Sequence, residues 1–245
     1  MILSLALGII QGITEFLPIS SSGHLYLIST VEWFKEDKIS FFVWLHLATF
    51  FTVVVFFYKE IIINLRKKQF IINIAVATFF TSLMAMGINK YVGKYFDSPY
   101  LIFSGFMITT TFLLLSRYCK ENKLNLDNFS LKEAIIFGIV QGITVVPGIS
   151  RSGITISTLI RRGFNFQSSF QISFLASLPV ILAAFIFESP KIINNGLKMV
   201  YVWGFFSAFL SGLLALTILK KIIKKRYMYY FGYYCFLIGI FSLVK

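Results

Sequence analysis

The chain reads GIIQGITEFLPISSSGH at residues 8–24 and carries a second version of this stretch, GIVQGITVVPGISRSGI, at residues 138–154. With a constant offset of 130 residues, 10 of the 16 positions from Gly8 to Gly23 are identical in the two stretches. The identical positions include Gln, Thr, Ser and Gly, so shared hydrophobicity does not explain the match. We interpret the two stretches as copies of one internal repeat.

The composition around these stretches is that of an integral membrane protein. Of the 245 residues, 57% are hydrophobic and 13% are charged, whereas soluble domains carry about 25% charged residues. This excludes an ordinary soluble globule, a disordered chain and a disulfide-rich secreted scaffold. The net charge of +13 comes from Lys and Arg that cluster between apolar runs. We therefore interpret them as flanks of membrane spans rather than as a nucleic-acid surface.

Six stretches are apolar and long enough to cross the hydrocarbon core, which takes roughly 20 helical residues. They run approximately over residues 41–58, 70–89, 100–116, 170–187, 199–219 and 228–244. The N-terminus has no basic region before its apolar residues, so no cleavable signal peptide is expected. The fold class expected is an all-α polytopic membrane protein with six transmembrane helices.

Two further apolar segments, residues 2–27 and 131–159, are interrupted by the repeated polar motifs. The interruptions are expected at 11–15 and 18–24 in the first segment, and at 141–144 and 147–153 in the second. Lipid cannot satisfy Pro, Gly, hydroxyl and charged groups at such a depth, so irregular backbone there must be buried in protein or line a watery cavity. We predict that both segments are broken or re-entrant helix pairs.

The order of these elements predicts how the two halves are related. Each broken segment is followed by three spans, an odd number, so the second half enters the membrane from the opposite side. We expect one integral membrane domain over residues 1–245, built from inverted repeats at about 1–118 and 131–245. In such folds the functional site lies near the midplane, where the two broken segments meet.

The distribution of basic residues predicts which side is cytoplasmic. Loops 59–69, 117–132, 161–162 and 220–226 carry fifteen Lys and Arg residues. Cytoplasmic loops are enriched in Lys and Arg, so these loops are expected inside and both termini outside. The other side carries seven basic residues, which are Lys35, Lys38, Lys90, Lys94, Lys191, Lys198 and Lys245.

Two charged side chains lie within the motifs and away from the membrane boundaries, Glu15 and Arg151. Ionisable groups at membrane depth are costly, so a functional role is the first interpretation. The alternative is that the two residues only pair and hold the halves together, although a buried pair is weak evidence for stability. The same motifs supply further polar side chains, namely Ser20, Ser21, Ser22, His24, Ser150, Ser152 and Thr155.

Residues 148–153, GISRSG, have the composition of an anion-binding nest. Glycine lets backbone N–H groups turn inward, hydroxyls donate hydrogen bonds, and the Arg151 guanidinium can hold two oxygens at once. A half-helix that starts near Ser152 would add the favourable field of its N-terminus. Phosphate is the expected ligand of this nest.

The first motif offers groups for reaction at a phosphate ester. Either Ser21 or His24 could be the nucleophile, and His24 could instead be the general acid or base. Glu15 could orient His24 or bind a divalent cation. The other histidine, His46, is assigned to packing, because it lies in an aromatic-rich span with no polar neighbour beyond Thr49.

Residues 11–25 and 147–155 resemble the two signatures of the bacterial undecaprenyl-diphosphate phosphatases of the bacitracin-resistance type, and the resemblance extends over essentially the whole chain. It implies a multi-pass inner-membrane hydrolase that converts C55 undecaprenyl diphosphate to the monophosphate carrier used in cell-wall synthesis. It also implies bacitracin resistance, an active site open to the outer face and a divalent cation, Mg²⁺ or Ca²⁺.

The resemblance also assigns roles to residues. Glu15 is the catalytic carboxylate and metal ligand, Ser21 and His24 are catalytic candidates, and Arg151 is the expected diphosphate clamp. Many members have Glu where this chain has Gln11, so only one motif carboxylate remains here to hold a metal. The substrate-binding residues expected are Gln11, Ser20, Ser22, Gly148, Ser150, Ser152 and Thr155.

A transporter or flippase for a lipid-linked or anionic solute is the alternative function, because inverted repeats with broken helices are also a transporter architecture. The group of Glu15, Ser21 and His24 favours the enzyme, since binding alone does not need it. The expected partners are a polyprenyl diphosphate lipid and membrane lipids, and no nucleic acid is expected. The sequence is also compatible with a homodimer.

Overall fold

The structure is a computed structural model, and it describes residues 1–29, 37–119, 123–194 and 198–244. Over these ranges the chain is helical and contains no β-strand, which confirms the all-α expectation. The helices of the first half are α1 (Ile2–Phe16), α2 (Ser21–Ser29), α3 (Lys38–Phe56), α4 (Tyr58–Asn64), α5 (Lys68–Val92) and α6 (Pro99–Ser116). Those of the second half are α7 (Leu131–Ile143), α8 (Arg151–Arg161), α9 (Phe166–Leu175), α10 (Ser177–Asn194), α11 (Met199–Lys224) and α12 (Tyr230–Val244). Three short 3-10 helices, Gly93–Tyr95, Leu126–Asn128 and Tyr227–Tyr229, join some of them.

The six expected membrane spans are confirmed, so the chain is a multi-pass membrane protein. The helical stretches that are long and apolar enough are Ile39–Phe56, Lys68–Tyr95, Pro99–Ser116, Phe166–Ile192, Met199–Lys224 and Tyr227–Val244. The fourth differs from the expectation in one respect. It consists of two helices, α9 and α10, that meet at Ala176, whereas the sequence predicts one unbroken helix.

The two broken segments are also confirmed as helix pairs. The first consists of α1 and α2, with residues 17–20 between them, and the second of α7 and α8, with residues 144–150 between them. The interruptions expected at 11–15 and 141–144 are wrong, because α1 stays helical through Phe16 and α7 through Ile143. The helical backbone keeps its own hydrogen bonds there, and the polar side chains face the protein interior.

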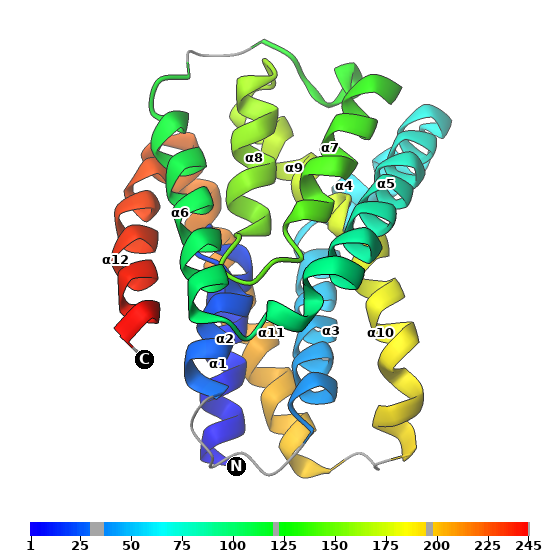
Figure 1. Ribbon diagram of the computed structural model, residues 1–245. Helices are drawn as coiled ribbons and strands as arrows, with labels where there is room; N and C mark the ends of the chain where they lie inside the picture. The colour runs from blue at the N-terminus through cyan, green and yellow to red at the C-terminus, as the bar shows by residue number, and fades with distance from the viewer. Residues whose placement is uncertain (30–36, 120–122, 195–197, 245) are drawn as a thin grey trace.

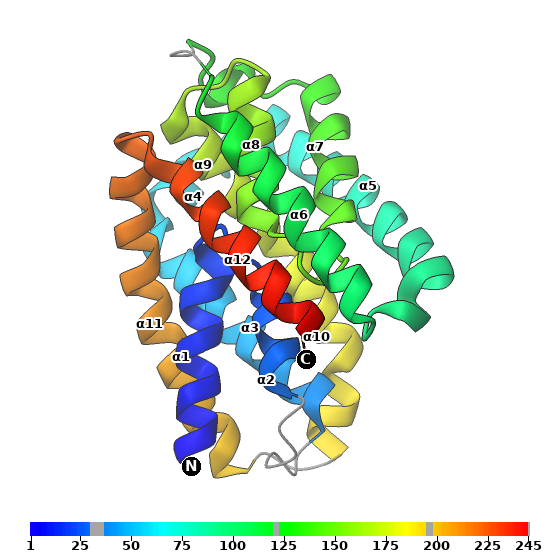
Figure 2. The same ribbon diagram turned by 60° about the vertical axis from the view of Figure 1, so that its left-hand side comes forward.

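The two broken segments run in from opposite ends of the molecule. In Figure 1, α1 starts at the lower end of the molecule and α7 at the upper end. Helix α1 packs along α11, its counterpart α7 packs along the counterpart helix α5, and α6 and α12 pack on each other (Figures 1 and 2). The inverted repeat of residues 1–118 and 131–245 stays a prediction, and these matching pairs support it.

Glycines of the repeat let these helix pairs approach closely. A Cβ atom built on Gly12 would lie 2.3 Å from the carbonyl oxygen of Ala208 in α11. A Cβ atom on Gly138 would lie 2.4 Å from the carbonyl oxygen of Ala77 in α5. Helices in membranes associate through such small residues, because lipid provides no hydrophobic drive for side-chain burial. The repeated glycines therefore serve helix packing.

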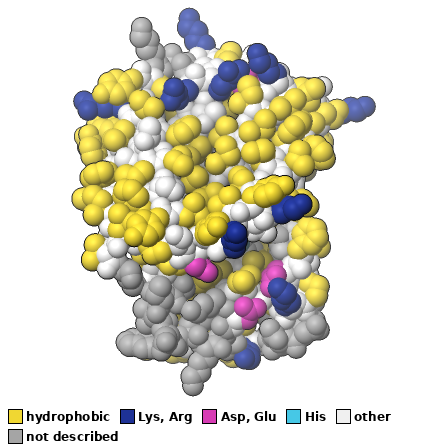
Figure 3. Space-filling view, viewed as in Figure 1, with side chains coloured by type: hydrophobic (Ala, Val, Ile, Leu, Met, Phe, Trp, Pro, Cys, Tyr) yellow, Lys and Arg dark blue, Asp and Glu magenta, His cyan; other side chains and the backbone are white. Residues whose placement is uncertain are grey.

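Basic residues gather at one end of the molecule. Residues 59–69, 117–119, 123–132, 161–162 and 220–226 lie toward the upper end in Figure 1, and the two ends of the described chain lie toward the lower end. Hydrophobic side chains cover the middle of the face shown in Figure 3, and Lys and Arg line its upper edge. Three lysines counted in the topology prediction, Lys35, Lys120 and Lys245, lie outside the described residues.

Candidate active site

A cavity of about 310 Å³ lies where the two broken segments meet, and α3, α5 and α10 complete its wall. Hydroxyl, amide and charged side chains line one part of it, and Ala, Val and Ile line the rest. Six of the residues that the sequence singles out line this cavity, namely Glu15, Ser20, Ser21, Ser22, Ser150 and Arg151. The structure therefore brings together groups from both copies of the repeat.

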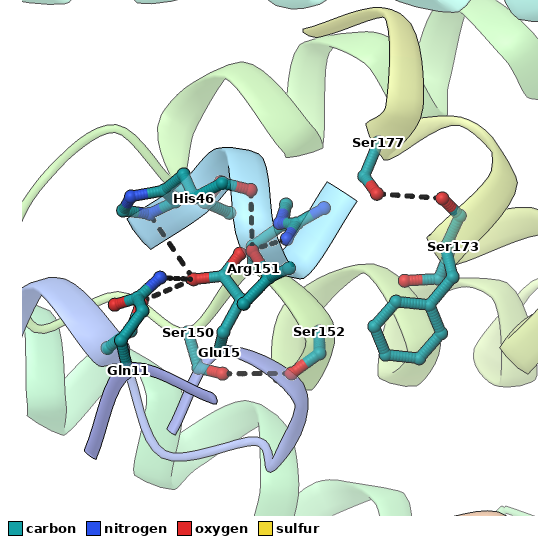
Figure 4. Close-up of polar contacts among 12 residues, drawn as sticks. Gln11, Glu15, His46, Ser150, Arg151, Ser152, Ser173 and Ser177 are labelled. Carbon is teal, nitrogen blue, oxygen red and sulfur yellow. Dashed lines mark hydrogen bonds and ion pairs between the residues drawn. The ribbon is translucent and has the colours of Figure 1, made fainter. Parts of the chain in front are cut away.

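Glu15 is the centre of the hydrogen-bond network beside the cavity (Figure 4). Its side chain is buried, and Oε1 pairs with the guanidinium of Arg151. The other oxygen, Oε2, accepts a hydrogen bond from the hydroxyl of Ser21 at 2.6 Å and one from the amide of Gln11 at 3.1 Å. A buried carboxylate needs such partners, because an unpaired charge in this environment is very costly.

His46 belongs to this network, so its assignment to packing is wrong. Its Nε2 lies 3.4 Å from Oε2 of Glu15, and the residue lines the cavity (Figure 4). Its Nδ1 lies 2.8 Å from the carbonyl oxygen of Phe42, one turn earlier in α3. A carbonyl can only accept, so Nδ1 is the donor and the ring is held with Nε2 toward the carboxylate.

The two copies of the motif form the same turn at the start of a helix. Ser20 precedes α2 and Ser150 precedes α8, and each hydroxyl accepts a bond from the backbone N–H three residues later, at 3.3 and 3.2 Å. Each of these hydroxyls also lies near that of the second following serine, Ser22 or Ser152, at 3.3 and 3.4 Å. The identical serines and glycines of the repeat are thus explained by helix capping.

The residue that begins each of these helices differs between the two copies. The first is Ser21, which follows Ser20 with its left-handed φ of 67°. The second is Arg151, which follows the N-cap Ser150. Both side chains line the cavity and both contact Glu15. Free backbone N–H groups at a helix N-terminus attract anions, so the cavity receives two such ends, one with a hydroxyl and one with a guanidinium.

His24 lies apart from the cavity lining. Its Nδ1 donates to the carbonyl oxygen of Ser20 at 2.7 Å, and its Nε2 lies 2.7 Å from the hydroxyl of Tyr234 in α12. The ring also meets the edge of Phe106 in α6. Because both ring nitrogens bond elsewhere, the expectation that Glu15 orients His24 is wrong. His24 instead holds the turn that precedes Ser21.

Four other predicted residues do not line the cavity but contact the segments that form it. Gln11 is buried against Glu15. Ser152 donates to the carbonyl oxygen of Leu17 at 3.3 Å and so ties the two broken segments together. The Thr155 hydroxyl lies 2.7 Å from both the carbonyl oxygen of Arg151 and the hydroxyl of Ser173. The fourth is Gly148.

Gly148 shapes the turn before α8. It has a φ of 87°, which favours glycine. A Cβ atom there would lie 2.3 Å from the carbonyl oxygen of Ile102 in α6. Its own carbonyl accepts from the hydroxyl of Thr109, and that hydroxyl in turn accepts from the backbone N–H of Ser150 at 2.8 Å. Gly148 therefore fixes the start of α8 rather than contacting a guest in the cavity.

The side chains present do not form a divalent-cation site by themselves. Among the described residues, no group of three or more His, Cys, Asp and Glu side chains is close enough to hold a metal. Both oxygens of Glu15 already have partners, and the neighbouring position that could add a carboxylate is Gln11. Mg²⁺ and Ca²⁺ need several oxygen ligands, so this donor set falls short without oxygens from a guest.

Several polar residues of the cavity were not predicted, among them Gln141, Thr81 and Ser177. Gln141 lines it and donates to the hydroxyl of Thr81 in α5 at 3.1 Å, while its own Oε1 is buried without a hydrogen-bond partner. Ser177 lines it from the start of α10. Gln141 is the repeat counterpart of Gln11, so the repeat could have indicated it. Thr81 and Ser177 carry no such signal in the sequence.

Known proteins match the chain over nearly its full length. The family described as bacitracin resistance protein BacA matches residues 4–241. The undecaprenyl-diphosphatase of Methanococcus vannielii is 39% identical over 98% of this chain and 98% of that protein. Those of Thermotoga petrophila and Carboxydothermus hydrogenoformans are 37% and 33% identical, again over 98% of this chain, and over 98% and 95% of their own lengths. The chain therefore belongs to the bacitracin resistance protein BacA family.

Proposed function

We propose that this protein is an undecaprenyl-diphosphate phosphatase. It hydrolyses the lipid diphosphate to undecaprenyl phosphate and inorganic phosphate, returns the carrier to cell-wall synthesis and confers resistance to bacitracin. The observation that carries the proposal is the contact of one buried carboxylate, Glu15, with both the hydroxyl of Ser21 and the guanidinium of Arg151. The relatives named undecaprenyl-diphosphatase support the same reaction.

The diphosphate binds between the N-termini of α2 and α8. The free N–H groups of both helices and the guanidinium of Arg151 attract its negative charge. A guanidinium has five N–H donors in a planar fork, so donors of Arg151 other than the one on Glu15 can take phosphate oxygens. The same donors stabilise the charge that spreads over the transferring phosphoryl group.

Ser21 is the proposed nucleophile, and Glu15 is its base. The Ser21 hydroxyl donates to Glu15 at 2.6 Å, which is the geometry of an activated nucleophile. Its Oγ attacks the terminal phosphorus as its proton passes to Oε2 of Glu15. The bond from that phosphorus to the bridging oxygen breaks, and the prenyl monophosphate leaves. Water then attacks the phosphorus of the phosphoserine, the bond to Oγ breaks, and Glu15 returns its proton to Ser21 as inorganic phosphate leaves.

His46 and Gln11 hold Glu15 in place for this proton transfer. Both lie against Oε2, the oxygen that also accepts from Ser21. Donors on a carboxylate oxygen fix its direction and favour its ionised form. The carboxylate therefore stays ionised and aimed at Ser21 when Arg151 also binds the substrate.

A divalent cation would be held here by Glu15, its one carboxylate, together with oxygens of the diphosphate. Mg²⁺ usually keeps several waters and binds through one or two carboxylates plus substrate phosphates. A cation held in that way would neutralise phosphate charge. The proton and phosphoryl transfers described above use only the side chains of the protein.

The cavity is open to the outer face of the cell membrane, and both termini lie outside. The count of fifteen basic residues against seven supports this orientation. Undecaprenyl diphosphate is then hydrolysed on the side where cell-wall polymers are assembled.

Phosphate release from the lipid tests the proposed function. Purified protein in detergent is mixed with undecaprenyl diphosphate, and inorganic phosphate is measured with and without a chelator. We expect release by the wild type and none above background by Glu15→Gln or Arg151→Ala. A folded wild-type protein that binds the lipid without releasing phosphate would reject the enzyme and favour a transporter.

A further inference from the structure

The packing of the two halves differs at one place. Helix α3 of the first half packs closely along α11 of the second half. The counterparts of these helices are α10 and α5, which touch each other at only a few residues. The spans also differ in burial: 33% of the 18-residue apolar window of Met199–Lys224 is buried, but only 17% of that of Lys68–Tyr95. Helix α5 therefore packs mainly against α7 and contacts α10 at only a few residues.

The cavity extends into the space between these two helices. Its lining includes Thr81 and Ala85 of α5 and Val180, Ile181 and Ala184 of α10, which together we name the α5–α10 seam. Ala184 is exposed on the protein surface and Ala85 is half-buried, although both line the cavity. The cavity thus reaches the outside of the helical bundle through the seam.

This opening lies at membrane depth. Ala85 precedes the end of its span at Tyr95 by ten residues, and Ala184 precedes the end of its span at Ile192 by eight. At 1.5 Å per helical residue, the two alanines lie about 15 and 12 Å from these ends. They lie about 8 and 6 Å before the first charged residues that follow them, Lys90 and Glu188. Both alanines therefore belong to the apolar parts of spans that cross a hydrocarbon core of about 30 Å. The neighbouring Leu83 and Leu182 are exposed, as expected of side chains that face lipid.

The polarity of the cavity changes along its length. Glu15, Arg151 and most of the hydroxyl groups that line the cavity come from the broken segments, whereas four of the five seam residues are Ala, Val or Ile. A volume of 310 Å³ is small, since pockets for drug-sized molecules span about 300–1,000 Å³. The cavity can hold a diphosphate head but not a long prenyl chain, so the chain must leave it.

We propose that the prenyl chain of the substrate runs out of the cavity through the α5–α10 seam into the bilayer. This inference rests on the proposed function, and it names the part of the protein that recognises the lipid chain. The small side chains of Ala85 and Ala184 leave room for the branched chain where it passes between the helices. Larger side chains at these two positions would close the passage.

Substitution of the seam alanines tests the path. Ala184→Trp and Ala85→Trp are compared with the wild type on undecaprenyl diphosphate and on a short, water-soluble prenyl diphosphate. We expect the ratio of kcat/KM for the long substrate to that for the short one to fall about tenfold or more, because overpacking excludes the chain. An unchanged ratio in both folded variants would overturn the proposal.

Ala75→Trp is the matched control, because Ala75 is an exposed alanine of the same helix α5 that does not line the cavity. Its ratio should equal that of the wild type. A fall as large as in Ala85→Trp would mean that a bulky group anywhere on α5 has this effect, and would also overturn the path.

Photolabelling tests the path without relying on turnover or on a variant. Wild-type protein is irradiated with an undecaprenyl diphosphate analogue that carries a photoreactive group on the first prenyl units, and labelled peptides are mapped by mass spectrometry. Labels on residues 79–86 and 180–187 are expected. Labels on α3 and α11, or none at the seam because a second copy of the chain covers it, would overturn the proposal. If no phosphate is released but the seam is labelled, the proposed function fails and the path stands.

Discussion

Glu15 and Arg151 lie 136 positions apart in the sequence, yet their side chains form a buried ion pair between the two copies of the repeat. Each residue comes from a different broken segment, so neither segment contains the site alone. The pair orients Glu15, which also accepts the Ser21 hydroxyl. One contact therefore both joins the two halves and prepares the proposed nucleophile.

The repeat explains how one scaffold came to carry two different groups. Ser20 and Ser150 cap α2 and α8 in the same way, and the next residue is Ser21 in one copy and Arg151 in the other. A symmetric pair of helix ends thus presents a nucleophile on one side of the cavity and a cation on the other. Glu15 has no carboxylate counterpart, because Val145 occupies the equivalent position.

Loss of the guanidinium should remove activity. Arg151→Ala is expected to lower kcat about a hundredfold or more, as for loss of a transition-state donor. Arg151→Lys should recover only part of it, because an ammonium lacks the planar fork. Phosphate release is measured beside thermal unfolding. Arg162→Ala, which removes an exposed pair with Glu133, is the control and should keep full activity. A folded Arg151→Ala variant with near wild-type turnover would refute the clamp.

The two histidines should respond differently to substitution. His46→Ala is expected to lower kcat about tenfold with little change in Tm, because it removes a group that positions Glu15, and His46→Gln should restore part of the activity. His24→Ala should lower kcat and Tm together, since it removes the bond that holds the Ser20 turn. The comparison of kcat with Tm checks both. A His24 variant that loses activity at unchanged Tm would make His24 catalytic.

A second carboxylate beside Glu15 should create a cation site. Gln11→Glu places two acids four residues apart on one helix face, where their charges repel each other unless a cation lies between them. We expect Mg²⁺ or Ca²⁺ to raise the Tm of this variant more than that of the wild type. Its activity should also fall more steeply with a chelator. Equal responses of the two proteins would contradict our interpretation of the donor set.

The space around each glycine predicts opposite effects for two glycine substitutions, one at the close contact of α1 and α11 and one in α5. Gly12→Ala should destabilise the protein by about 1–3 kcal/mol, because its Cβ would meet the backbone of Ala208. Gly87→Ala, in α5, meets nothing within 4 Å and should stabilise by about 0.5–1 kcal/mol through helix propensity. Denaturant unfolding in detergent measures both. A Gly12→Ala variant as stable as the wild type would contradict the packing.

Much of the fold could be predicted from local patterns. Hydropathy indicates each span, because a membrane helix must be apolar over its whole length. The Pro and Gly positions of the motifs correctly indicate the breaks before α2 and α8. The break at Ala176 does not show in the hydropathy, which stays high through it, although Pro179 follows it by three residues. The polar side chains at 11–15 were misread as a break because side-chain polarity does not disrupt helical backbone bonds.

The site was predictable only in part. Glu15, Ser21 and Arg151 stand out because polar groups are rare at membrane depth. His46 was missed because its partner Glu15 belongs to another helix, and no periodicity within α3 reveals that contact. The partner of His24 could not be predicted for the same reason, since Tyr234 approaches it from α12, 210 positions later.

The central claim, that Ser21 attacks the terminal phosphate, is tested most directly by trapping the phosphoryl-enzyme. Wild-type protein is mixed with undecaprenyl diphosphate labelled in its terminal phosphate and quenched with a denaturant at neutral pH during the first turnover, so that a phosphoryl group on either Ser21 or His24 survives, and the labelled peptide is sequenced. We predict a phosphoryl group on Ser21 that persists in Ser22→Ala and disappears, together with phosphate release, in Ser21→Ala. A label on His24, or continued turnover by Ser21→Ala without a covalent intermediate, would contradict the account.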